Sequence, residues 1–349
     1  MSHTESNTSA VLSKAVDDQY EQTAKRYGGE SAHQKAKADG KTKLGYSQWI
    51  QVRTPAFKAW FGDWESLDIQ NKFDAFIRDS LSAKDPVGEF SVRSVTEPER
   101  IEILKQSGID VGGMEHVISA QWIKHAKEKH GSANETAKEK GNQRSLTDND
   151  LLNILVVIDA YDGLTVQKKL SNKTSIIYSK KMNDGTIEYV ERVIETSGKH
   201  KPRLVTKTAW VKTPIGAETN LPRVYTPERN SSMAFSNGRI NPDSVSKVVD
   251  ENGEPLVAYH GIAGDFSTFD MVKGRMVCGG ANIIPVFLRI ENPMMIDGYE
   301  ATPKDIALAK QLGHDGIIIK HGESDDGSSD YITFTPTQIK SAPLIGAGH

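Results

Sequence analysis

The chain has 349 residues, which favours two or three domains, and its hydrophobic content of 37% is enough for folded cores. A formal net charge of -3 excludes a globally basic surface that wraps nucleic acid, so any such binding requires a local basic patch. The single cysteine, Cys278, excludes an intramolecular disulfide and fits a reducing compartment.

Metal and membrane partners are not expected from the composition. One cysteine and ten scattered histidines show no spacing typical of zinc ligands. The polar N-terminus has no apolar segment like that of a secretory signal, and no apolar run approaches the roughly 20 residues of a membrane span. The sequence therefore predicts a soluble protein that acts in a cytoplasm, without a bound metal.

The first 85 residues divide into a polar part and an aromatic part. Residues 1–45 are rich in Ser, Thr, Lys and Ala, which predicts a polar, partly helical segment without a core of its own. An aromatic segment follows over 46–85, with Trp49, Trp60 and Trp64 close together. We expect these rings to form a small cluster that docks on another domain.

Helical spacing follows over 97–131. The pattern predicts a second helix that begins near Glu115, after the glycine pair at 112–113. The apolar residues of that helix leave three histidines on other parts of its surface, namely His116, His125 and His130. Thr147 is a candidate N-cap of a further helix.

Residues 162–213 change to a strand-like period. Four runs rich in β-branched and aromatic residues occur there, with Asn183–Asp184–Gly185 as a hairpin turn between the second and third. We therefore predict an α+β domain over 86–213, with helices followed by a four-stranded antiparallel meander.

The remaining sequence predicts a second, small α+β domain over 245–343, joined by a linker over 214–244 and followed by a tail over 344–349. Within it, residues 285–296 are expected to form a strand pair around a proline-containing turn. Thr302 is a candidate helix cap, with Pro303 in the first turn.

Two long strings resemble one known family. VRTPAFKAWFGDW at 52–64 and SKVVDENGEPLVAYHG at 246–261 look like the leading segment and first strand of the ADP-ribosyltransferase-like domain of phage polyvalent proteins. PVFLRIENP at 285–293 and HDGIIIK at 314–320 resemble later parts of that domain. The resemblance implies a phage or prophage protein, acting in a host bacterial cytoplasm and carried there in the virion.

The middle of the chain resembles the phage members of the barnase–EndoU–colicin E5/D–RelE-like nucleases. The strings that carry the resemblance are HVISAQWIKHAKEKHG at 116–131, SLTDNDLL at 145–152, TSIIYSKK at 174–181 and LVTKTAWVK at 204–212. It implies an endoribonuclease effector or toxin that cleaves host RNA, with a cognate inhibitor or another phage protein as its protein partner.

Metal-independent RNA cleavage needs a base for the 2′-OH, an acid for the leaving 5′-oxygen and cations for the phosphate. Histidine suits the first two roles because its pKa lies near neutrality. His125 and His130 are five residues apart, so on one straight helix they point about 140° away from each other. We favour His125, since His130 precedes Gly131 at the expected helix end. The alternative is that both are solvent-exposed helix residues.

The predicted strands supply the other candidates. In the second predicted strand, alternation puts Tyr178 and Lys180 on one face. In the fourth, it puts Thr206, Thr208 and Trp210 on one face. The alternative for the lysines is a solvated sheet edge, and threonine is ordinary in strands. The predicted catalytic residues are His125, His130, Lys180, Thr206 and Thr208, and the predicted RNA-binding residues are Tyr178, Arg192, Arg203 and Trp210.

The resemblance of the C-terminal domain implies that His260, Gly261 and Gln338 bind NAD. The sequence departs from that pattern, because Ile262 replaces the usual threonine and the stretch 271–284 is too short for the element that stacks on nicotinamide. We interpret the domain as shortened and inactive. Three functions therefore stay open: an endoribonuclease without a cofactor, an NAD-dependent ADP-ribosyltransferase, and a non-enzymatic phage interaction protein.

Overall fold

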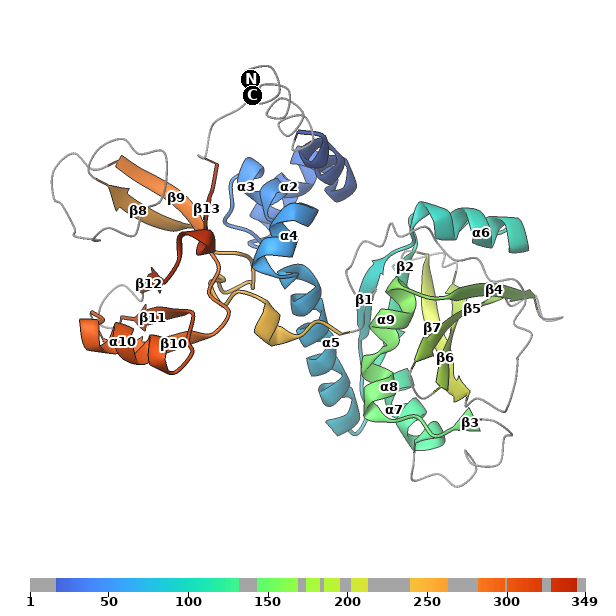
Figure 1. Ribbon diagram of the computed structural model, residues 1–349. Helices are drawn as coiled ribbons and strands as arrows, with labels where there is room; N and C mark the ends of the chain where they lie inside the picture. The colour runs from blue at the N-terminus through green and yellow to red at the C-terminus, as the bar shows by residue number, and fades with distance from the viewer. Residues whose placement is uncertain are drawn as a thin grey trace, which may run out of the picture. The chain divides into compact units, whose positions relative to one another are not determined.

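The chain divides into two compact units in the computed structural model (Figure 1). The first unit consists of Met1–Glu65 and Asn241–His349, and the second consists of Ser66–Ile240. The boundary between them falls inside the aromatic segment predicted over 46–85. Within the described residues, no helix is long and apolar enough to cross a membrane. The structure describes residues 17–131, 143–168, 174–182, 185–194, 202–212, 239–262, 282–298, 300–321 and 328–343.

The second unit is built on one mixed sheet with the strand order β1-β2-β7-β6-β5-β4, in which β3 also pairs with β7. Strands β4 to β7 are consecutive antiparallel neighbours, whereas β2 and β7 run parallel. The predicted α+β class is confirmed. The strands are β1 (Glu89–Ser94), β2 (Glu115–Ser119), β3 (Gln143–Arg144), β4 (Gly163–Lys168), β5 (Thr174–Met182), β6 (Gly185–Ile194) and β7 (Arg203–Lys212).

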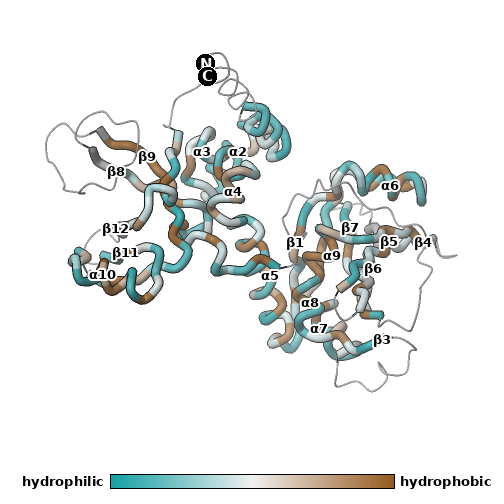
Figure 2. Tube along the Cα trace, viewed as in Figure 1, coloured by the Kyte–Doolittle hydropathy of each residue, from teal (hydrophilic) through white to brown (hydrophobic). Residues whose placement is uncertain are grey.

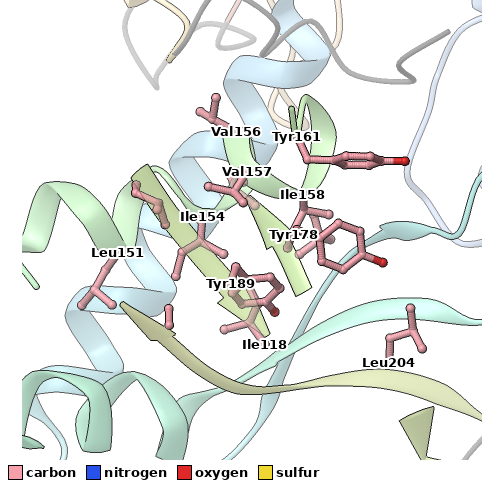
Figure 3. Close-up of a cluster of buried hydrophobic side chains, with 14 of the residues drawn as sticks. Ile118, Leu151, Ile154, Val156, Val157, Ile158, Tyr161, Tyr178, Tyr189 and Leu204 are labelled. Atoms are coloured by element: carbon pink, nitrogen blue, oxygen red, sulfur yellow. The ribbon is translucent and has the colours of Figure 1, made fainter. Parts of the chain in front are cut away.

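Helices cover one face of this sheet and enclose the core of the unit. All six residues of α9 are buried, and the five that precede Asp159 are apolar (Figure 2). Tyr178 and Tyr189 from the sheet join Ile118 and Leu204 in the same cluster (Figure 3). The helices of the unit are α5 (Trp64–Ser82), which begins just before the unit boundary, α6 (Glu97–Ser107), α7 (Ala120–His130), α8 (Asp148–Leu152) and α9 (Ile154–Asp159).

The helix predicted from Glu115 is wrong over its first five residues, which form strand β2. β2 pairs with β1 on one side and with β7 on the other. The short apolar run around Val117 fits a helical or an extended period, and the two neighbouring strands decide for the extended form. The helix begins only at Ala120, where the Ser119 side chain accepts a hydrogen bond from the backbone N–H of Trp122.

Two helix starts and one hairpin were predicted correctly from local sequence signals. The side chains of Thr147 and Thr302 accept hydrogen bonds from the backbone N–H groups three residues later, as predicted for N-caps. Strands β5 and β6 form the expected antiparallel hairpin, in which Met182 pairs with Gly185. The two residues at 183–184 lie outside the described part of the chain.

The first unit combines helices from its N-terminal part with two small sheets from its C-terminal part. One sheet has the order β13-β9-β8 and the other the order β10-β11-β12. Residues 17–27 are helical. The further elements are α2 (Gly29–Ala38), α3 (Tyr46–Gln51), α4 (Pro55–Phe61), β8 (Ala258–Ile262), β9 (Asn282–Leu288), β10 (Pro293–Asp297), α10 (Pro303–Gln311), β11 (Gly316–Lys320), β12 (Ser329–Thr333) and β13 (Ile339–Ser341), with short 3-10 turns at Pro242–Ser244 and Pro336–Gln338.

The strand pair predicted over 285–296 is wrong, because β9 and β10 lie in different sheets. β10 pairs in parallel with β11 instead. The aromatic segment was expected to dock on another domain, and it packs on the C-terminal part of the same unit. The ring of Phe57 packs edge-on against Phe287 at 5.0 Å, and the Trp60 indole N–H donates to the carbonyl of Thr337.

Candidate functional site

Strand β7 presents two chemically different faces, and a β-bulge changes which residues lie on each. Val190 of β6 pairs with Thr208, whereas the next residue, Glu191, pairs with Thr206, so Lys207 is the extra residue. Leu204, Thr206, Ala209 and Val211 are buried on the core side. The other residues of β7, together with Lys181 of β5, make up the face that we call the outer face: Arg203, Val205, Lys207, Thr208, Trp210 and Lys212.

The outer face combines cations, hydroxyls and an aromatic ring. Lys181 and Lys212 stand in one row of the sheet, because both pair with Thr186 from opposite sides. In the neighbouring row, Trp210 pairs with Glu188 of β6, and Glu188 pairs with Ser179 of β5. Lys181 is exposed, and the β7 side chains of this face are half-buried.

Several nitrogen donors of this face are shielded from water without a partner among the described residues. Trp210 Nε1 is one, and Nε and Nη1 of Arg203 are two more. Only Nη2 of Arg203 is used, in a 2.9 Å hydrogen bond to Glu89. A shielded donor without an acceptor costs free energy, and a ligand cannot reach these nitrogens unless the side chains that cover them move.

The opposite, core-facing side contains a fully buried charge network. Arg93 of β1 donates to both carboxylate oxygens of Glu99, at 2.6 and 2.9 Å. His116 of β2 lies between two carboxylates, with Nδ1 at 2.8 Å from Glu191 and Nε2 at 3.6 Å from Glu99. His116, Glu99 and Glu191 are each no more than 1% exposed.

The buried histidine is held in its charged form. Burial opposes the charge on His116, but Glu191 and Glu99 outweigh burial and Arg93, and they raise the pKa of His116 from 6.5 to about 9. Burial also opposes the charge on Glu99, but His116 and Arg93 hold the pKa of Glu99 well below its usual range. Since protonated Nε2 is a donor, the 3.3 Å approach of Arg93 Nη1 to it is a contact between two cations that share Glu99.

Hydroxyl groups extend this network to β7. The Tyr189 hydroxyl lies 3.1 Å from Glu191 and 2.8 Å from the Thr206 hydroxyl. Thr206 in turn donates to the backbone carbonyl of Val117 at 3.0 Å. Tyr189 donates to Glu191 and Thr206 donates to Val117, so the proton of either hydroxyl can also serve the contact between Tyr189 and Thr206.

The prediction that Thr206, Thr208 and Trp210 share one face is wrong. The bulge puts Thr206 in the core and leaves Thr208 and Trp210 on the outer face. Tyr178 is also fully buried, and its hydroxyl has no hydrogen-bond partner among the described residues. Lys180, on the same side of β5 as Tyr178, is half-buried and forms a 3.2 Å ion pair with Asp162.

His125 of α7 does not lie beside the outer face. The buried stripe of α7, which includes Trp122 and Ala126, packs on the core side of the sheet, and His125 is exposed on the other side of the helix. The side chains of His130 and Arg192 lie outside the described part of the structure. Of the predicted residues, Thr208, Arg203 and Trp210 are therefore brought onto one surface, and His125 is separate from them.

Sequence reasoning missed Arg93, Glu99 and Glu191, and it put His116 on the surface. A strand interpretation of 115–119 would have signalled His116, since alternation gives it an inward position. Glu191 follows Ile187 and Tyr189 at a spacing of two on β6, which was a second usable signal. Among the described residues, no group of three His, Cys, Asp or Glu side chains could hold a metal ion.

Two of the residues predicted to bind NAD lie on β8, and Gln338 has a structural role. The Gln338 side-chain oxygen accepts from the backbone N–H groups of Phe334 and Thr335. Its amide donates both hydrogens, to the carbonyls of Arg289 and Asp315. These bonds use both amide hydrogens of Gln338 within the first unit. His260 of β8 is exposed, and Gly261 follows it.

Comparison with known proteins identifies the domain that carries this sheet. Residues 93–218 match the model of a family described as phage-Barnase-EndoU-ColicinE5/D-RelE like nuclease3. The chain thus contains a domain similar to this nuclease family, within its second unit. The match includes Arg93, His116 and all of β4 to β7. No curated protein and no solved structure matches the chain.

Proposed function

We propose that the second unit is an endoribonuclease that binds RNA on the outer face and cleaves it without a metal, by attack of the 2′-OH on the adjacent phosphate. The observation that carries the proposal is the composition of that face. Lysines 181 and 212 supply positive charge for phosphate, Trp210 supplies a ring on which a base stacks, and Thr208 supplies a hydroxyl. The similarity of residues 93–218 to a nuclease family supports the same activity.

The outer face is a better candidate for the RNA site than the buried network. RNA cannot reach His116 or Glu191, because both are fully buried. On the outer face, in contrast, Lys181 is exposed and the side chains of Thr208 and Trp210 are half-buried, so a phosphate and a base can reach them.

The test is incubation of the purified chain with total RNA in EDTA. We expect discrete fragments that end in a 2′,3′-cyclic phosphate. Two double variants locate the site: Lys181→Ala with Trp210→Ala on the outer face, and His125→Ala with His130→Ala on α7. We expect at least tenfold slower cleavage for the first pair and an unchanged rate for the second.

Each alternative has its own outcome. Loss of cleavage only in the α7 variant would move the site to that helix. Intact RNA at a temperature where both units are folded, or cleavage that requires a divalent metal, would contradict the proposal. As an effector against host RNA, the chain should also be toxic when produced in bacterial cells, and the Lys181→Ala, Trp210→Ala variant should relieve that toxicity.

For the first unit, we propose a non-enzymatic role, in which it docks on another phage protein, rather than transfer of ADP-ribose from NAD. The saturated hydrogen bonds of Gln338 support this choice, because both of its amide hydrogens are used within the unit. Millimolar NAD should leave the melting temperature of the chain unchanged. A melting temperature that rises with NAD concentration would restore the transferase as a candidate.

A further inference from the structure

One edge of β7 changes its partner at the bulge. β2 pairs in parallel with the start of β7, at Leu204 and Val205. β3 pairs antiparallel with its end, at Val211 and Lys212. Between these two short ladders, neither β2 nor β3 pairs with residues 206–210, and the extra residue Lys207 lies in this interval.

A ring of side-chain contacts spans this interval. His116 contacts Glu191 at 2.8 Å, and Tyr189 connects Glu191 to Thr206. Thr206 then returns to β2 through the carbonyl of Val117, the residue next to His116. The contacts therefore close a loop over β2, β6 and β7 at the residue that precedes the bulge.

The bulge decides which side chains of β7 reach the outer face. Leu204 and Thr206 are buried, and regular alternation from them would also turn Thr208 and Trp210 into the core. The extra residue at Lys207 reverses the alternation, so that Ala209 and Val211 are buried instead. A residue that holds the bulge in place therefore also controls the composition of the outer face.

We infer that Thr206 is a positioning residue for the RNA site, in which its buried hydroxyl anchors the bulge of β7 and thereby directs Thr208 and Trp210 to the outer face. Thr206 contacts no RNA in this arrangement, since it is only 8% exposed and faces the core. It acts through the backbone of the next two residues. The inference deepens the proposed function and rests on it for the kinetic part of its test.

Two variants separate the hydroxyl of Thr206 from its volume. Thr206→Val keeps the shape of the side chain and removes the hydroxyl, whereas Thr206→Ser keeps the hydroxyl. The first measurement is peptide- and residue-resolved amide hydrogen exchange, which needs no enzymatic activity. We expect Thr206→Val to accelerate exchange at Lys207 and Thr208 by at least about tenfold, with little change in β4 and β5, and Thr206→Ser to exchange like the wild type.

The second measurement is cleavage of a defined RNA oligonucleotide in EDTA. Thr206→Val should lower kcat between about tenfold and a hundredfold, because misplaced groups lose their alignment with the phosphate, and Thr206→Ser should restore it. The melting temperature of each variant gives the control for global unfolding. A merely structural role would lower that temperature and accelerate exchange throughout the second unit.

The outcomes distinguish the two claims. A wild-type protein that leaves RNA intact would contradict the proposed function, and hydrogen exchange would still test the anchoring of the bulge. Wild-type cleavage with an equally active and equally protected Thr206→Val variant would overturn the positioning role alone. Uniformly faster exchange across the unit would overturn it as well.

Discussion

Each unit buries an arginine among carboxylates, but the two networks are built differently. In the first unit, Arg53 donates to Glu254 at 2.6 Å and its guanidinium lies 4.3 Å from the ring of Trp49. In the second unit, Arg93 donates to Glu99 at 2.6 Å and approaches the ring of His116 instead. Both arginine side chains are below 10% exposed, at 9% and 7%.

The second cation of each network makes the difference. In the first unit, this cation is Lys58, which donates to a second carboxylate, Glu65, at 2.7 Å. The pKa of Lys58 is raised because Glu65 and Asp63 outweigh the effect of burial. The corresponding second cation in the second unit is His116, which titrates much closer to neutrality. The lysine of the first network therefore keeps its charge well above neutrality, whereas the second network depends on the protonation of one histidine.

The largest effect is expected from removal of the arginine in the second unit. Arg93→Met should lower the free energy of unfolding of that unit by about 3–5 kcal/mol, because Glu99 would keep only part of its neutralising charge while buried. Peptide-resolved hydrogen exchange across a urea series measures the loss in each unit separately. Lys72→Ala, which removes an exposed ion pair with Asp68, is the control and should cost at most about 0.5 kcal/mol.

A pH titration sharpens the comparison. A folded pKa of about 9 against 6.5 means that His116 contributes its full stabilisation below pH 6.5, and that this is lost as the pH rises through about 9. The loss is at most about 3 kcal/mol in the second unit. Urea unfolding at pH 6 and pH 9.5 should detect it. His116→Gln should remove this pH dependence, and a variant that keeps the same dependence would contradict the charged state of His116.

A smaller loss is expected from Arg53→Met in the first unit. Lys58 continues to neutralise Glu65, so Glu254 is the carboxylate that loses its cation. We expect a loss of about 2 kcal/mol in that unit, measured by the same hydrogen exchange, with the second unit unchanged. A loss equal to that of Arg93→Met would mean that the aromatic rings and Lys58 give no compensation.

Elements with local signals were predictable from the sequence. Thr147 and Thr302 are N-caps because a threonine side chain can accept a hydrogen bond from the backbone N–H three residues later, wherever the helix is located. The β5–β6 hairpin was similarly predictable from the Asn183–Asp184–Gly185 sequence between two β-rich runs. Such signals depend only on neighbouring residues.

Elements with distant partners were not predictable in the same way. Residues 115–119 form β2 because β1 and β7 flank them, and β7 begins 84 residues after β2 ends. The same is true of β10, which pairs with β11 rather than with β9. For the candidate site, the sequence predicted Arg203, Thr208 and Trp210, but it also placed Thr206 beside them.

By itself, the sequence determined the α+β class, the helix caps, the β5–β6 hairpin and the resemblance to nucleases that a family model supports over 93–218. These follow from residue types, spacing and extended similarity. Only the tertiary structure decided that His116 is buried between two carboxylates and that Thr206 and Trp210 lie on opposite faces of β7. The physical reason is that one extra residue in a strand reverses the alternation after it, and an inserted residue is visible only when the partner strand is known.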